Sequence, residues 1–599
     1  ALTDNNVVFN NNGTFQKTYL FRGKDGSNMT EDMVNAYYVG LNNIFLRLKA
    51  NYYIFIEQAK RETGDVIQSH FSDSLLSDFQ KNREENLTKN KVFQNDFYLT
   101  ICYRWPSEAL QRAARVIDKS NKEVLSEAKS AIKEFINVFN PIQSGLDEIY
   151  KDQRETSFHF HELERKFLDE CELITKGLSD YFVEIHPCNQ EETLTYLHDC
   201  ISDQHVSVKA NVRSNITERL KDCVFLGGRY PKLGEKYIGI VGIKDMPADT
   251  MDFFLNRLNS LSIEYRFSVR YIALDKDQAV NELKKIIAQH RQREKTILTI
   301  LMESLRNIDS GKVDRDAVLD TEDAEQAYEL LSRDEIGFGY LSFEIVILDK
   351  DFKRLEENLS EIRTIVNDLG FVATIEKDNA TAAWLSTIPS NYENNVRRYL
   401  VNSTNFCNIA PMGAYWEGQK KNKHFEDLAK TVHRDDLNFV VDPLIQCITP
   451  EHLPFFLNLH IGDVGHTLIV GPTGSGKSVL LNAISANFKK YPNCKVFVFD
   501  KSASSRVLTK AIGGNFYNLL VDNQSISFQP LAHINDSVEK TWVLEWLVNY
   551  LEASNVKITP IHRNTILNAL NSVSTAPESE RTITALITML QDEEIRNSL

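Results

Sequence analysis

The feature that most constrains the fold of this chain is a run of eight residues that matches G-x-x-x-x-G-K-[ST], the phosphate-binding loop, at every fixed position. It reads Gly471, Pro472, Thr473, Gly474, Ser475, Gly476, Lys477 and Ser478. The apolar residues 467–470 before it predict a buried parallel strand, and residues 479–488 after it have the spacing of a helix. A strand before the loop and a helix after it are the context that this motif requires.

The chemistry of the motif explains its residue types. Glycines let the backbone approach phosphate oxygens closely, and successive N–H groups with a helix N-terminus attract the negative charge. Lys477 is expected to reach the β- and γ-phosphates as the catalytic candidate, and the hydroxyl of Ser478 to ligate Mg²⁺. The expected cofactors are therefore ATP and Mg²⁺, and the expected nucleotide-binding set is residues 471–478 together with Val479.

A second strand is predicted at residues 495–500, ending at Asp500. A carboxylate at that edge of a parallel sheet faces the ligand crevice, so Asp500 is a second candidate for Mg²⁺, directly or through water. The alternative, that Asp500 simply begins a loop, has equal weight. Residues 587–594 offer Asp592 and Glu593 as the acidic strand that a motor needs, but the apolar spacing there is helical, which favours a helix with a solvated end.

Composition and charge narrow the class of protein. A length of 599 residues predicts several domains, and no apolar run is long enough to span a bilayer. Eight cysteines without a CxxC pair suit a reducing cytoplasm. The first residue is Ala1, which indicates that the natural start is absent, and no signal peptide is recognisable. The net charge of −15 lies almost wholly before residue 450 and argues against a broad nucleic-acid surface there.

Upstream of the loop, strand-like and helix-like segments alternate. Strands are predicted at residues 15–23, 51–59, 96–105, 237–243, 264–274, 339–348 and 371–377. Helices are predicted at residues 31–49, 70–88, 121–138, 157–181, 248–261, 277–308 and 351–369, the last ending at Gly370. The order predicts two or three split β-α-β units of ferredoxin-like type, which are scaffolds and imply no chemistry.

A polar, proline-containing stretch between residues 415 and 455 predicts a domain boundary. The predicted fold is therefore α/β and α+β. Residues 1–440 form an N-terminal scaffold of ferredoxin-like units with long helices, and residues 441–599 form the first part of a RecA-like P-loop domain.

Two other patterns are interpreted structurally. His186 with Cys188, and His198 with Cys200, have a spacing that resembles a zinc site, but His198 and Cys200 more simply share a helix. The aromatic residues 52, 53 and 55 fit a core better than a base-stacking platform.

With these motifs in place, the chain resembles the TrbE/VirB-type ATPases of conjugative transfer and type IV secretion over nearly its whole length. Residues 457–481 are similar to the family's approach to its P-loop, and residues 498–519 to the segment after the second strand. Residues 527–531 match a short family motif with Gln529 in place of Asn. Residues 323–331, 337–347, 388–391 and 394–400 are similar to the family's N-terminal domain, with Ser390 in place of Gly.

The resemblance implies a RecA-like motor that works as a hexamer at the cytoplasmic face of the inner membrane. The N-terminal domain would dock on membrane partners and on other ATPase subunits of the apparatus, and the cargo would be DNA or protein. Residues 582–599 resemble the helix that precedes the acidic strand, so the catalytic carboxylates and arginine finger are expected beyond this chain, which by itself is expected to be inactive.

Two rival functions stay open on the sequence. A DNA translocase of the FtsK/HerA kind shares the motor core, although the acidic N-terminal region disfavours it. A structural subunit that binds nucleotide to lock an assembly, without turnover, is the second.

Overall fold

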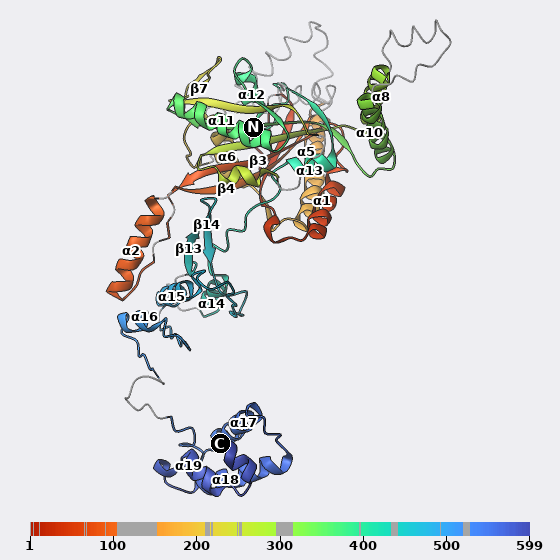
Figure 1. Cartoon of the computed structure of the whole chain (residues 1–599). Coiled ribbons are helices and arrows are strands. Elements are labelled where there is room, and N and C mark those ends of the chain that lie inside the picture. The colour runs from red at the N-terminus through yellow and green to blue at the C-terminus, as the bar shows by residue number, and fades with distance from the viewer. Residues whose placement is uncertain are drawn as a thin grey trace, which may run out of the picture. The chain divides into compact units, whose positions relative to one another are not determined.

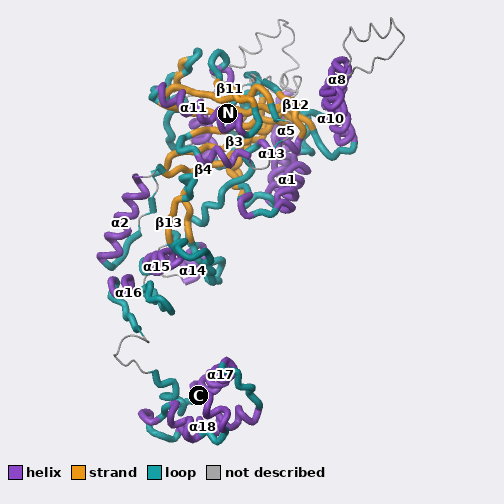
Figure 2. Tube along the Cα trace, viewed as in Figure 1, coloured by secondary structure: helices purple, strands orange, loops and turns teal. Residues whose placement is uncertain are grey.

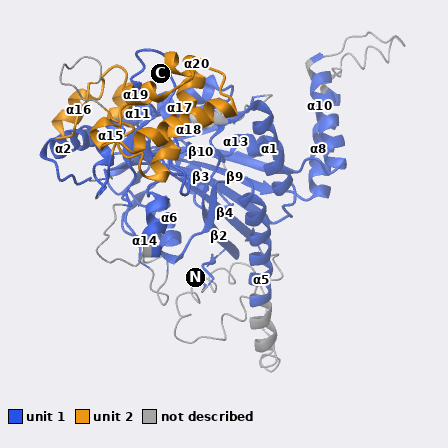
Figure 3. Ribbon diagram, turned by 90° about the horizontal axis from the view of Figure 1, so that it is seen from below, with its two compact units in different colours: residues 1–477, 483–495 blue, residues 478–482, 496–599 orange. Residues whose placement is uncertain are grey.

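The computed structural model describes the chain except for residues 1, 4, 11, 65, 68, 90, 105–151, 210–215, 217–219, 248–249, 251–253, 295–314, 395–396, 433–440, 492 and 519–527. By its contacts the chain divides into two compact units, coloured separately in Figure 3. The first holds Ala1–Lys477 and Ala483–Lys495, and the second holds Ser478–Asn482 and Val496–Leu599. Every strand among the described residues lies in the first unit.

A twelve-stranded antiparallel sheet forms the centre of the first unit (Figure 2). Its main path is β1-β2-β4-β3-β9-β10-β8-β7-β6, with β5 beside β2, β12 beside β10 and β11 beside β8. The strands are β1 Val8–Phe9, β2 Thr14–Arg22, β3 Tyr52–Thr63, β4 Val92–Arg104, β5 Glu184–Pro187, β6 Phe225–Leu226, β7 Lys232–Leu233, β8 Lys236–Asp245, β9 Tyr265–Ala273, β10 Phe338–Asp349, β11 Val372–Ile375 and β12 Tyr399–Asn402.

The two halves of this sheet repeat one strand order. In the first half the chain runs β2, α1 (Glu31–Phe45), β3, β4, α5 (Asp152–Ser179) and β5, and the strands lie as β5-β2-β4-β3. In the second it runs β8, η2 (Phe254–Ser260), β9, β10, α11 (Phe352–Asp368) and β11, and they lie as β11-β8-β10-β9. Both orders are that of a β-α-β-β-α-β unit. Antiparallel pairing of β3 with β9 joins the halves into one sheet.

Each half carries an insertion between its second and third strands. In the first half it contains α2 (Ser74–Lys89), and in the second it contains α8 (Lys276–Glu294) and α10 (Arg315–Ser332), which pack on each other and project from the sheet in Figure 1. The sequence did not predict α10. The predicted helix at 248–261 is described only as the 3₁₀ helix η2, and the predicted helix at 121–138 and the end of the one at 277–308 lie outside the described residues.

The remaining elements of the first unit are short. They are α6 Gln190–Ile201, α12 Ala380–Ser386, α13 Ser403–Ile409, α14 Lys423–Val432, the two-stranded hairpin β13 Ile445–Ile448 with β14 Pro454–Leu457, and α15 Lys477–Phe488, whose residues 478–482 belong to the second unit.

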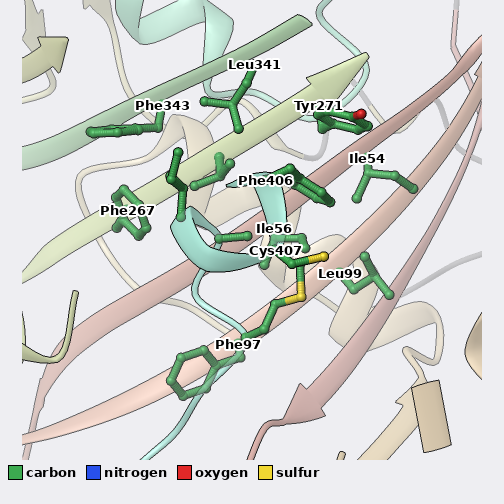
Figure 4. Packing of buried hydrophobic residues seen from close by; sticks show 14 of the residues in the cluster. Ile54, Ile56, Phe97, Leu99, Phe267, Tyr271, Leu341, Phe343, Phe406 and Cys407 are labelled. Atoms are coloured by element: carbon green, nitrogen blue, oxygen red, sulfur yellow. The ribbon is translucent and has the colours of Figure 1, made fainter. Parts of the chain in front are cut away.

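The main core lies on one face of the sheet. Alternate residues of the strands point to it, among them Ile54 and Ile56 of β3, Phe267 of β9 and Phe343 of β10 (Figure 4). Helices α1, α5, α11 and α13 cover this face with their apolar sides. The predicted assignment of residues 52, 53 and 55 to the interior is confirmed, because all three side chains are buried.

The opposite face of the sheet is also buried but carries charged groups. Glu57 of β3 and Arg266 of β9 form a two-pronged ion pair, with N–O distances of 2.8 and 2.6 Å. Further along, Arg270 of β9 donates to Ser342 of β10 at 3.0 Å, and Glu344 of β10 is buried. Helices α6 and α12 cover parts of this face through apolar contacts. Such groups are tolerated only when they are paired or neutral.

Glu344 is expected to make stability depend on pH. Burial raises its pKa from 4.5 to about 7, against the opposing charge of Arg270 and with Glu376 adding to the rise. A raised carboxyl pKa gives stability that is complete below the unfolded value and is lost as the pH rises through 7. We therefore expect Glu344→Gln to change the free energy of unfolding little at pH 4.5 and to increase it by up to ~3 kcal/mol at pH 8.

Urea denaturation of the chain at both pH values measures this effect. Glu357→Gln, at an exposed position of α11, is the matched control and should change neither value by more than ~0.5 kcal/mol. Equal effects of Glu344→Gln at pH 4.5 and pH 8 would contradict the assignment.

Candidate functional site

The phosphate-binding loop turns at two glycines. Gly474 has φ of +85° and Gly476 has φ of +87°, the left-handed region that only glycine adopts without strain. Gly476 is the N-cap of α15 and has no side chain to bind the first N–H groups of the helix. A helix start leaves those N–H groups without partners inside the helix, so this end of α15 has the chemistry to bind an anion.

Lys477 is folded back over the loop. Its ammonium group donates hydrogen bonds to the carbonyl oxygens of Gly471 at 2.8 Å and Pro472 at 2.7 Å. The backbone N–H of Ser475 is 3.3 Å from the carbonyl oxygen of Pro472, which closes the turn. Residues 471–476, Ser478 and Val479 are exposed and Lys477 is partly exposed, so the loop presents backbone donors and a cation to solvent. These residues fit a bound phosphate chain with its magnesium ion.

The two strands predicted beside the loop are wrong for this structure. Residues 467–470 and 495–500 take part in no ladder, and every ladder among the described residues is antiparallel. Their side chains are exposed, with Leu468 at 86% and Phe499 at 100%. A buried parallel strand exists only between neighbours that supply its hydrogen bonds and cover its faces, and no described segment does so here.

Asp500 organises its own loop in the second unit. Its carboxylate accepts hydrogen bonds from the backbone N–H groups of Ser505 at 2.9 Å and Ser502 at 3.0 Å, and from the hydroxyls of Ser504 and Ser505. Those backbone donors lower the pKa of Asp500 to about 2. This geometry favours the structural alternative for Asp500. The serines were missed in the sequence, where an acid followed closely by serines is the signal of such a turn.

The rest of the second unit is a helical cluster. It contains α16 Arg506–Ala511, α17 Ser537–Ala553, α18 Pro560–Ser574, η3 Glu578–Glu580, α19 Ile583–Met589 and α20 Glu593–Ser598. Residues 583–589 are helical, as predicted. Asp592 is not the solvated end of that helix but the N-cap of the next one, since its carboxylate accepts the N–H of Ile595 at 3.0 Å. Gln529 donates to the carbonyl oxygen of Glu578 at 2.6 Å and so fixes the turn before α19.

The histidine and cysteine pattern has separate partners. His198 lies on α6, as predicted, and its Nε2 is 2.8 Å from a carboxylate oxygen of Asp222, while Cys188 and Cys200 are buried in an apolar cluster. Within the described residues, no group of three or more such side chains is placed to hold a metal ion. No helix in the same portion of the chain combines the length and apolar character needed to cross a bilayer.

Comparison with known families gives two matches in the first unit. Residues 6–111 match the N-terminal domain of the type IV secretion system ATPase VirB4/TrbE. Residues 177–397 match the CagE, TrbE, VirB family, a component of the type IV transporter system. Both matches end before residue 471, so the assignment of the loop rests on its own residues.

Individual relatives agree with the family matches. The chain is 30% identical over 413 residues to a probable conjugal transfer protein TrbE of Sinorhizobium fredii, covering 68% of this chain and 60% of that protein. It is 26% identical to the conjugal transfer protein TrbE of Rhizobium radiobacter, covering 100% of this chain and 70% of the relative. It is 22% identical to the type IV secretion system protein virB4 of Brucella melitensis, covering 97% and 66%.

The chain thus spans from 60% to 70% of the length of these three relatives. Two family matches on the sheet and relatives of one kind along the chain agree with each other. The chain belongs to the VirB4/TrbE family of type IV secretion system ATPases.

Proposed function

We propose that residues 471–479 bind ATP with Mg²⁺. The observation that carries the proposal is the turn at Gly474 and Gly476, which leads directly into the uncapped start of α15 with the ammonium group of Lys477 over the loop. In the bound state the ammonium would exchange the carbonyl oxygens of Gly471 and Pro472 for phosphate oxygens. The hydroxyl of Ser478 would complete the shell of the metal ion.

We infer that the whole protein is an ATPase that energises a conjugative transfer or type IV secretion apparatus, in pilus assembly or substrate transport. The family and the printed names of the relatives support this activity. A homo-oligomer, expected to be a hexamer, at the cytoplasmic face of the inner membrane belongs to the same proposal. So do docking of residues 1–440 on membrane partners and other ATPase subunits, and a DNA or protein cargo.

Residues 441–599 are proposed to contribute the first part of a RecA-like domain. The motif and the exposed apolar runs at residues 467–470 and 495–500 support this, since those runs have the composition of inner strands that need neighbours. Asp500 stays a weaker candidate for Mg²⁺, because its carboxylate is engaged by its own loop.

Nucleotide titration of the purified chain tests the binding proposal. We expect one ATP site whose affinity falls on the order of tenfold when EDTA removes Mg²⁺, and we expect that dependence to be largely lost in Ser478→Ala. Ser485→Ala, on the same helix after the loop, is the matched control and should keep the dependence. Failure of the chain to retain labelled ATP in the presence of Mg²⁺ would refute the proposal.

A further inference from the structure

The two-stranded hairpin β13–β14 supports both flanks of the phosphate-binding loop. Ile484 of α15 joins Leu444, Ile445 and Tyr491 in one buried apolar cluster. Ile469, just before the loop, packs against the same cluster. The position of the hairpin therefore affects the chain on each side of residues 471–478.

Lys490, just after α15, ties this segment to the main chain of the hairpin. Its buried ammonium group donates to the carbonyl oxygen of Leu444 at 3.0 Å and to that of Pro443. Burial lowers the pKa of Lys490 to about 8, with Asp442 opposing the shift and Arg83 adding to it. A buried ammonium needs such acceptors, so the two carbonyl groups and Lys490 hold each other in place.

An arm of the N-terminal sheet holds the same strand from another element. The arm is residues 64–91, which connect β3 to β4 and include α2. The guanidinium group of Arg83 donates to the carbonyl oxygen of Gln446, and the backbone N–H of Ile67 donates to the side-chain oxygen of Gln446 at 2.8 Å. At the start of β4, the N–H of Phe93 donates to the carbonyl oxygen of His452 in the hairpin turn at 2.9 Å. Figure 1 shows α2 and β13 leaving the same end of the sheet.

The hairpin explains why cations meet there. Among the described strands β13 pairs only with β14, so its outer edge leaves carbonyl groups without a strand partner. Arg83 from the arm and Lys490 from the segment after α15 bind three carbonyl groups along this edge, those of residues 443, 444 and 446.

We propose that Arg83 and Lys490 are positioning residues for the loop, and that β13 transmits the position of the N-terminal arm to α15. The inference rests on the proposed nucleotide site and adds a link from that site to the N-terminal sheet. Both residues act through the strand, so a change at either one should reach the loop through the cluster around Ile484. Coupling carried by a chain of packed and hydrogen-bonded groups is commonly about five-fold or more in an equilibrium constant.

The first test needs no nucleotide. Amide hydrogen exchange over residues 477–488 is measured in the wild-type chain, in Arg83→Gln and in Lys81→Gln, an exposed control on α2. We expect exchange at least about fivefold faster in Arg83→Gln and unchanged in the control, since Arg83 can loosen α15 only through β13. Unchanged exchange in Arg83→Gln would overturn the inference whether or not the chain binds ATP.

The second test measures affinity for Mg²⁺-ATP. Arg83→Gln and Lys490→Met should each raise the Kd at least about fivefold, and the double variant should be little worse than the weaker-binding single variant, because both act through one strand. Lys490→Arg should recover most of the affinity, and the exposed neighbour Lys489→Met should lose none. Additive effects of the two changes, or none, would overturn the link. Absence of binding by the wild type would refute the proposed function and leave the exchange test to decide the inference.

Discussion

Lys477→Ala is expected to weaken the binding of Mg²⁺-ATP on the order of a hundredfold, because charge-assisted hydrogen bonds to phosphate oxygens are lost. The fold should be unaffected. The hydrogen bonds described for Lys477 go to carbonyl oxygens of its own loop, at 2.8 and 2.7 Å, and the residue lies outside the apolar clusters. A surface change of this kind alters the free energy of unfolding by less than ~0.5 kcal/mol.

Equilibrium titration with a fluorescent ATP analogue measures this loss, and thermal unfolding without nucleotide checks the fold. Lys489→Ala, an exposed lysine just after the same helix, removes an equal charge and should keep wild-type affinity. Wild-type affinity in Lys477→Ala would show that nucleotide, if bound, is held elsewhere in the chain.

Arg266→Met should destabilise the first unit by ~3–5 kcal/mol, the cost of leaving a buried charge without its partner. Glu57 is 1% exposed at its side chain, and its two oxygens accept from Arg266 at 2.8 and 2.6 Å. Arg266 also donates to the carbonyl oxygen of Cys200 at 3.3 Å, so the variant loses a tie between β9 and the end of α6. No other cation among the described residues pairs with Glu57 in the same two-pronged way.

Urea denaturation followed by circular dichroism gives the measurement. The double variant Glu57→Leu with Arg266→Met should recover much of the lost stability, since it removes both charges together. Arg257→Met is the control, because Arg257 pairs with Asp368 at 3.7 Å between two exposed side chains and should cost less than ~1 kcal/mol. A single Arg266→Met variant as stable as the control would contradict this account of the sheet.

Periodicity along the chain predicted most of the N-terminal elements. The alternation in residues 51–59 and 339–348 belongs to β3 and β10, and the apolar spacing of residues 351–369 belongs to α11, which ends where Gly370 takes φ of +90°. These signals are local, because a strand or helix shows its buried face in its own residues. Ser390, in place of the family's Gly, is held at φ of +68°, which explains why glycine suits this turn.

The loop was predictable for a similar reason, and the strands beside it were not. The glycines of residues 471–476 set the turn themselves, whereas residues 467–470 and 495–500 become strands only if other segments pair with them. Their exposed apolar side chains show that composition alone does not make a strand. Asp592 shows the same limit at a helix end, since capping the next helix depends on where that helix begins.

By itself, the amino-acid sequence determined the periods of the strands and helices, the phosphate-binding loop and the family. Only the tertiary structure decided that β3 pairs with β9 to join two β-α-β-β-α-β units into one sheet, and that Glu57 meets Arg266 on its second face. It also decided that the arm around Arg83 and the segment at Lys490 meet on β13. The physical reason is that these contacts join residues far apart in the chain, where no local pattern records the partner.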